Sequence, residues 1–295
     1  MKRILLVTAY DGTEYSGFAA QKNPEIRTIE GEISKALMTL TGENPEIIGA
    51  SRTDAGVHAL CNYAVFDTCS PIPPENFAKA LNARLPEDIR IQASWETTPD
   101  FHPRRMKSVK TYEYRIHCSR IPDPVKARYA CSCYWNLDVA AMQKAAEYLV
   151  GEHDFASFAN PARQTATSVR EITELVIERT WCHVPDILQN MPKKPGEETM
   201  PGAEAMPAAE DAGRRRETLS VTEACDIVIR VSGKGFLYNM VRIIAGTLIR
   251  VGRGLILPED IPEILEAQNR QAAGETAPAC GLHLVNYRFA AIPPA

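Results

Sequence analysis

One carboxylate in this chain stands in a setting that suggests chemistry. In the segment Ala50–Leu60, ASRTDAGVHAL, Asp54 follows Arg52 by two residues and precedes Gly56 by two. An aspartate held ionised in a pocket by a nearby cation can act as a nucleophile or as a general base. The alternative is a structural turn, in which Asp54 accepts backbone hydrogen bonds and Gly56 supplies a positive φ. The spacing alone favours the turn.

The other residues that often carry chemistry do not form a recognisable motif. Of the eight cysteines only Cys131 and Cys133 are close in sequence, and the CSC spacing matches neither a zinc knuckle nor a redox pair. The six histidines are scattered, without metal-ligand spacing. We therefore expect reduced cysteines, no metal and no cofactor.

Length and composition indicate the general class of protein. A chain of 295 residues suits two domains of about 100 to 150 residues each, and 45% hydrophobic with 24% charged residues is typical of soluble globular proteins. The apolar run at the N-terminus meets Asp11 before a signal-peptide core could form. Because no apolar run approaches the roughly 18 residues of a membrane span, we expect a cytoplasmic protein without a membrane partner.

Positive charge is concentrated in one segment although the formal net charge is -4. Residues 101–128 contain eight Lys/Arg and two acidic residues, with tyrosines between them. Such a segment is either a solvated strand edge or a track that binds the phosphates of a nucleic acid. The candidate RNA contacts of this basic track are Arg104, Arg105, Lys107 and Lys110.

The elements that must position Asp54 follow the same order in both halves of the chain. In the first half, apolar periodicity predicts strands at 3–9, 47–50, 63–66 and 89–95, with helices at 28–40 and 74–85. In the second half the same order is less clear, with strands predicted at 109–116, 172–179 and 227–231 and helices at 137–150 and 238–251. The order βαββαβ is that of the ferredoxin-like unit.

We therefore predict an α+β fold of two ferredoxin-like domains, whose antiparallel sheets meet at a central active-site cleft. The first domain spans residues 1–105 and carries the Asp54 loop, and the second spans 106–295. Residues 185–220 contain five prolines and few large apolar side chains. This composition predicts a flexible insertion in the second domain.

Seven blocks of the sequence resemble one known family. The string RTDAGVHA resembles the RTDxGVHA motif of the TruA-type tRNA pseudouridine synthases. Six further blocks are similar to motifs of that family and occur in the family's order: Ala9–Gln21, Leu81–Ile91, Phe101–Ile116, Gly151–Phe158, Phe236–Gly254 and Ala277–Leu284. One departure is Phe18-Ala19, where the family usually has Trp-Gln.

The resemblance implies a role for each residue that matches a motif. Asp54 matches the family's essential aspartate, which begins the breakage of the uridine N1–C1′ bond, as nucleophile or as general base. Tyr112 matches a tyrosine that stacks on the target base, and Arg242 matches an arginine that pairs with the aspartate. An arginine in so apolar a helix is costly to bury without a partner, which supports that pairing. Arg52 matches an arginine that holds the flipped nucleotide. Leu282 matches an apolar residue of the pocket.

The function implied by the resemblance is an isomerase that converts uridine to pseudouridine at positions 38, 39 and 40 of the tRNA anticodon stem-loop. The family's enzymes are homodimers that need no cofactor. Two alternatives stay open: a pseudouridine synthase for other tRNA positions, and an inert RNA-binding module that does not need Asp54. An aspartyl-phosphate enzyme would want a second acid nearby for Mg²⁺, and Gly56 stands there instead.

Overall fold

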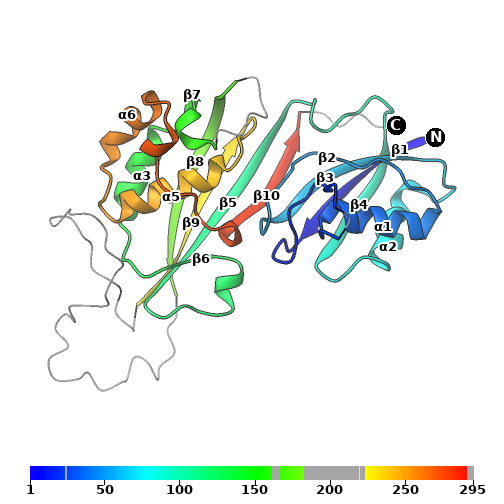
Figure 1. The fold of residues 1–295 in the computed structure, drawn as a ribbon, viewed down its shortest axis with the longest axis horizontal. Coiled ribbons are helices and arrows are strands. Elements are labelled where there is room, and N and C mark those ends of the chain that lie inside the picture. Colours follow the sequence, from blue (N-terminus) through cyan, green and yellow to red (C-terminus); the bar gives the residue numbers. More distant parts are fainter. Residues whose placement is uncertain (24, 161–166, 183–218, 220–222, 291–295) are drawn as a thin grey trace, which may run out of the picture.

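One mixed sheet runs through both halves of the molecule (Figure 1). The structure is a computed structural model that describes residues 1–23, 25–160, 167–182, 219 and 223–290, and these residues form a sheet of ten strands. The strand order is β4-β1-β3-β10-β5-β9-β8-β7, with β2 paired to β3 and β6 paired to β5.

The first half of the chain supplies four strands and two helices. The strands are β1 (Lys2–Tyr10), β2 (Ile48–Gly49), β3 (His58–Thr68) and β4 (Ile89–Thr97), and the helices are α1 (Ile29–Thr41) and α2 (Phe77–Asn82). Helix α1 begins where the Thr28 side chain accepts a hydrogen bond from the Gly31 N–H. It ends at Gly42, whose φ of 74° closes the last turn.

The second half supplies the other strands and three further helices. The strands are β5 (Ser108–Ser119), β6 (Cys131–Cys133), β7 (Gly151–Asp154), β8 (Val169–Trp181), β9 (Ala224–Gly233) and β10 (Leu282–Phe289). The helices are α3 (Val139–Glu147), α5 (Met240–Gly252) and α6 (Ile261–Glu266). Helix α5 is buried on most sides, which agrees with its apolar sequence.

Both halves contain the βαββαβ unit, although the sequence predicts its last strand only in the first half. In the first half the unit is β1-α1-β2-β3-α2-β4, and in the second it is β5-α3-β8-β9-α5-β10. In each half the fourth strand of the unit lies beside the first, the first beside the third, and the third beside the second. The α+β class is therefore confirmed.

Strand β10, which the sequence analysis did not predict, joins the two halves. It pairs antiparallel with β5 along most of its length and parallel with β3 through His283 and Leu284. The two halves therefore share one continuous sheet, and the domain boundary after residue 105 stays a prediction. The site described below lies beside this junction.

Two further predictions concern the insertion in the second half and membrane-spanning segments. The insertion expected at 185–220 lies outside the described residues except for Leu219, whose N–H donates to the Tyr134 carbonyl at 3.2 Å. Within the described part of the chain, no helix has the length and apolar character to cross a membrane.

Candidate active site

The loop that carries Asp54 is a tight turn between β2 and β3. The Val57 N–H donates to the Asp54 carbonyl at 3.2 Å, and Gly56 has φ 76°, as the turn requires. The positive φ expected at Gly56 is thus confirmed. The Asp54 carboxylate, however, accepts no hydrogen bond from any described residue, so it does not act as a backbone cap. The turn therefore positions the Asp54 carboxylate without binding it through hydrogen bonds.

The N-terminal block holds this loop from below. The Phe18 N–H donates to the Thr53 carbonyl at 3.1 Å. A Cβ added at Gly12 would lie 2.1 Å from the Val57 carbonyl oxygen, and one at Gly17, where φ is 97°, would lie 2.7 Å from the Thr53 carbonyl oxygen. Only glycine therefore permits this close backbone approach. This segment was predicted to matter only through its resemblance to the family, and its supporting role has no signal in the sequence.

A buried polar network fixes the residues just before Asp54. The Tyr10 hydroxyl lies 2.7 Å from the Thr53 hydroxyl and accepts a hydrogen bond from the Asn62 amide at 3.1 Å. Asn62 also donates to the Ser51 carbonyl at 2.9 Å and accepts from the Ser51 N–H at 3.2 Å. A satisfied buried network of this kind favours a single loop conformation. Its one sequence signal was a polar Asn62 within a strand-like apolar run.

Arg242 is the cation nearest to Asp54. Its Nη1 lies 3.9 Å from Asp54 Oδ2, and the two side chains are 17% and 24% exposed. The guanidinium is held in place because Nε donates to the Ala277 carbonyl at 2.7 Å and Nη1 donates to Asn239 Oδ1 at 3.0 Å. Burial raises the pKa of the Asp54 carboxyl, and Arg242 offsets part of that rise. The cation therefore limits protonation of Asp54 without cancelling the effect of burial.

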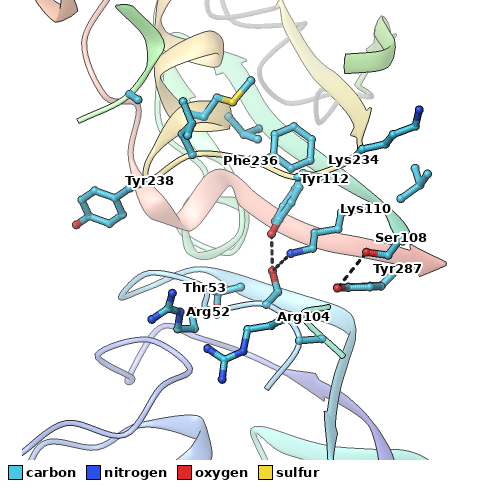
Figure 2. A pocket seen from close by; sticks show the side chains of 18 of the residues that line it. Arg52, Thr53, Arg104, Ser108, Lys110, Tyr112, Lys234, Phe236, Tyr238 and Tyr287 are labelled. Atoms are coloured by element: carbon cyan, nitrogen blue, oxygen red, sulfur yellow. Dashed lines mark hydrogen bonds between the residues drawn. The ribbon is translucent and has the colours of Figure 1, made fainter. Parts of the chain in front are cut away.

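Asp54 lines a cavity of about 1420 Å³ between the two halves. Figure 2 shows other side chains that line this cavity, Arg52 and Tyr112 among them. Tyr112, Leu282 and Arg52 also line it. Tyr112 is buried on β5, with its hydroxyl 2.9 Å from the Ser51 hydroxyl and its ring edge-to-face with Phe236 at 5.2 Å. Burial raises the pKa of the Tyr112 phenol to about 12, so it is neutral at ordinary pH.

Leu282 and Arg52 occupy different parts of this cavity. Leu282 is the buried first residue of β10 and pairs with Tyr114 on β5. Arg52 is exposed, and no acidic group of the described chain lies within 4.0 Å of it. Arg52 is therefore free to contact a ligand. The cation that lies beside Asp54 is Arg242, which is distant from it in sequence.

Lys110 lines the same cavity as Arg104 and Lys107 of the basic track, but it is less exposed than they are. It shares one face of β5 with Tyr112, so its side chain points into the cavity, where Nζ donates to the Ser51 hydroxyl at 3.3 Å (Figure 2). The ammonium also lies 5.0 Å from the centre of the Tyr287 ring. Burial lowers the pKa of Lys110 to about 8, and the nearby Arg104 contributes.

The rest of the basic segment divides into paired and unpaired residues. Three of its cations are in ion pairs: Arg115 with Glu113 at 2.9 Å, Lys126 with Asp226 at 2.7 Å, and Arg128 with Asp11 at 3.1 Å. Four exposed cations have no acidic partner within 4.0 Å among the described residues: Arg104, Arg105, Lys107 and Arg120. Arg104 and Lys107 line the cavity, so two of these unpaired charges lie at its rim.

Comparison with known proteins identifies the family of this chain. The family model described as tRNA pseudouridine synthase matches residues 6–104 and 145–290. This chain belongs to the tRNA pseudouridine synthase family. A relative named tRNA pseudouridine synthase A from Acetivibrio thermocellus is 39% identical over 289 residues, covering 98% of this chain and 100% of the relative. A relative of the same name from Brevibacillus brevis is 40% identical over 282 residues, covering 96% and 97%.

The match to the family covers most of the site. The two matched segments contain Asp54, Arg242 and Leu282, whereas Tyr112 falls between them. The full-length relatives span the whole site, including β5. The family's usual Trp-Gln is replaced by Phe18-Ala19, and Phe18 is fully buried with its ring 6.1 Å from that of Tyr10. This departure therefore affects packing beneath the Asp54 loop.

Metal-ligand geometry occurs once in the described part of the chain, and it lies away from Asp54. Ligand atoms of His117, Cys182 and Asp226 lie within 4.8 Å of one another. Lys126 Nζ already contacts this group, at 2.7 Å from Asp226 Oδ2 and 3.2 Å from Cys182 Sγ. None of these residues lines the cavity, so the group belongs to an ion-pair cluster at the far end of β5 and β9.

Proposed function

We propose that this protein isomerises uridine to pseudouridine in tRNA, at positions 38, 39 and 40 of the anticodon stem-loop. One observation carries the proposal: in a member of the tRNA pseudouridine synthase family, the carboxylate of Asp54 lies 3.9 Å from Arg242, and Asp54 lines the same cavity as Tyr112. The relatives' names support tRNA as the substrate. The resemblance to TruA-type enzymes supports the three positions.

The reaction needs one ionised carboxylate beside the nucleoside. Asp54 either adds to the substrate as nucleophile or removes a sugar proton as general base, and the N1–C1′ bond then breaks. The base turns and forms a new bond from C5 to C1′, after which C5 loses a proton and N1 gains one. No oxidant, reductant or group donor is consumed, which is why no cofactor is expected.

The cavity and its rim suit an RNA substrate. Taking a uridine out of a stem costs a few kcal/mol, and stacking on an aromatic side chain such as Tyr112 returns about 1 to 3 kcal/mol. The exposed cations Arg104, Arg105, Lys107 and Arg52 would contact phosphates and supply the remainder. Binding should therefore weaken steeply as the salt concentration rises.

The assembly and location of the protein form the last part of the proposal. By resemblance to the family, we propose a cytoplasmic homodimer whose second subunit helps to hold the tRNA. Light scattering after size-exclusion chromatography tests the dimer directly: a monomer at all accessible concentrations would contradict it.

The experiment that tests the function maps pseudouridine on unmodified tRNA incubated with the protein alone. Carbodiimide-dependent primer extension should give stops at positions 38 to 40. Stops at other positions would support the alternative of a synthase with a different target. If the folded protein binds tRNA and gives no stops, the inert RNA-binding module is the correct reading.

A further inference from the structure

The buried side chains of Tyr112 and Ser51 and the half-buried side chain of Lys110 form a continuous hydrogen-bonded chain in the wall of the cavity (Figure 2). The Tyr112 hydroxyl lies 2.9 Å from the Ser51 hydroxyl, and Lys110 Nζ lies 3.3 Å from the same Ser51 oxygen. Lys110 and Tyr112 point the same way from β5, and Ser51 stands three residues before Asp54. The chain thus runs beside the candidate active site and ends at an amine.

The proposed reaction has a step that such a chain can serve. When C5 has bonded to C1′, its remaining hydrogen must leave as a proton. A neutral phenol can accept that proton only if it passes its own proton on. Ser51 is the one hydrogen-bond partner of the Tyr112 hydroxyl among the described residues, and a hydroxyl must in turn pass a proton to a third group. Lys110 is that third group.

The surroundings of Lys110 favour its neutral form. Arg52 on the Asp54 loop and Arg104 before β5 are positive, and Tyr287 on β10 and Tyr112 on β5 are neutral phenols. Among the described residues no carboxylate forms an ion pair with the ammonium. Burial and these two arginines lower the pKa of Lys110 to about 8, so part of the population carries a free amine at neutral pH.

We propose that Lys110 takes up, through Ser51, the proton that Tyr112 removes from C5, so that it serves the reaction as the end of a proton relay. The inference rests on the proposed function. The C5–H bond breaks and its electron pair forms the C5–C6 double bond, while the C6–N1 π pair moves to N1. The C5 proton goes to Tyr112, the phenol proton to Ser51, and the Ser51 proton to the amine. The ammonium then returns one proton to solvent, and N1 takes one up.

The test follows release of tritium to water from tRNA labelled at uracil C5, in single turnovers at several pH values. The wild-type rate should rise with pH through about 8, as the amine becomes neutral. Lys110→Met and Lys110→Arg should each lose about 10²-fold in rate and lose that pH dependence, since neither side chain can accept the proton. Their dissociation constants for tRNA should equal that of the wild type.

Ser51→Ala cuts the same relay while it keeps the Lys110 side chain, and it should lose rate to a similar degree. It also serves if Lys110→Met fails to fold, which thermal melting will show. As a baseline, Asp54→Asn should release no tritium, because the earlier bond breakage is absent.

Two results would overturn the relay alone. Lys110→Arg could keep most of the rate, or Lys110→Met could weaken tRNA binding as much as Arg104→Ala does; either result makes Lys110 a cationic contact to RNA. In both cases the wild type still makes pseudouridine. A wild-type protein that makes no pseudouridine in any tRNA would instead remove the proposed function itself.

Discussion

Replacing Arg242 with methionine tests how Asp54 is kept ionised. The guanidinium and the carboxylate are 3.9 Å apart and largely buried. Two unit charges about 4 Å apart interact by about 1 kcal/mol in water and about 4 kcal/mol at an effective dielectric constant of about 20. Burial already raises the pKa of Asp54, so loss of the cation raises it further. At about 1.4 kcal/mol per factor of ten, the rate on the acidic side of the pH profile should fall between about 5-fold and about 10³-fold.

The assay is single-turnover pseudouridine formation measured from acidic to mildly alkaline pH. The Arg242→Met rate should approach that of the wild type as pH rises, because the carboxylate is then restored. Arg242→Lys is the matched control, since it keeps the charge and loses the hydrogen bond from Nε to Ala277. A rate deficit in Arg242→Met that is the same at every pH would refute the electrostatic argument. So would an Arg242→Lys pH profile identical to that of Arg242→Met.

Three further predictions address the fold and the rim of the site. Asp54→Asn should melt at a higher temperature than the wild type at neutral pH, because the folded state disfavours the charged carboxyl. This gain in melting temperature should vanish as pH falls and Asp54 of the wild type protonates. A lower melting temperature of Asp54→Asn at neutral pH would contradict this. Gly12→Ala should lose single-turnover rate and about 1 to 3 kcal/mol of stability, because its Cβ would lie 2.1 Å from a carbonyl oxygen of the Asp54 loop. Gly42→Ala, whose φ is 74° and whose Cβ would meet nothing within 4 Å, should lower the melting temperature without changing the rate, and equal rate losses would exclude the loop argument. Arg104→Ala should reduce the slope of log affinity for tRNA against log salt by about 1. Arg128→Ala, whose guanidinium is already in an ion pair at 3.1 Å, should leave that slope unchanged, and the opposite ranking would disprove the assigned rim.

The sequence predicted best those elements whose ends are marked by capping residues. Helix α1 has a capping Thr28 and a terminal Gly42, and the predicted range 28–40 agrees with the structure to within a residue at each end. Strand β3 begins at His58, whereas the prediction began at residue 63. The prediction was too short because the polar Asn62 interrupts the apolar pattern of the strand. Strand β10 was missed because pairing with β5 and β3, from two distant parts of the chain, stabilises it.

Contacts between distant residues limited what could be predicted about the site. The resemblance identified Asp54 and Arg242, but only the fold shows that they lie 3.9 Å apart. The partial burial of Lys110 could not be predicted, because the sequence of the basic track gives charge without burial. The available signal was its position two residues before Tyr112 on the same strand, which places both side chains on one face. The network around Ser51 has only one sequence signal, the polar Asn62, because its members come from four separate segments of the chain.

The most direct test of the central claim compares the wild type with Asp54→Asn on one unmodified tRNA. We predict that the variant is folded, binds the tRNA with the affinity of the wild type, and forms no pseudouridine in single turnovers. If Asp54→Asn forms pseudouridine at the wild-type rate, the Asp54 carboxylate does not start the reaction, and the account given for this cavity is wrong.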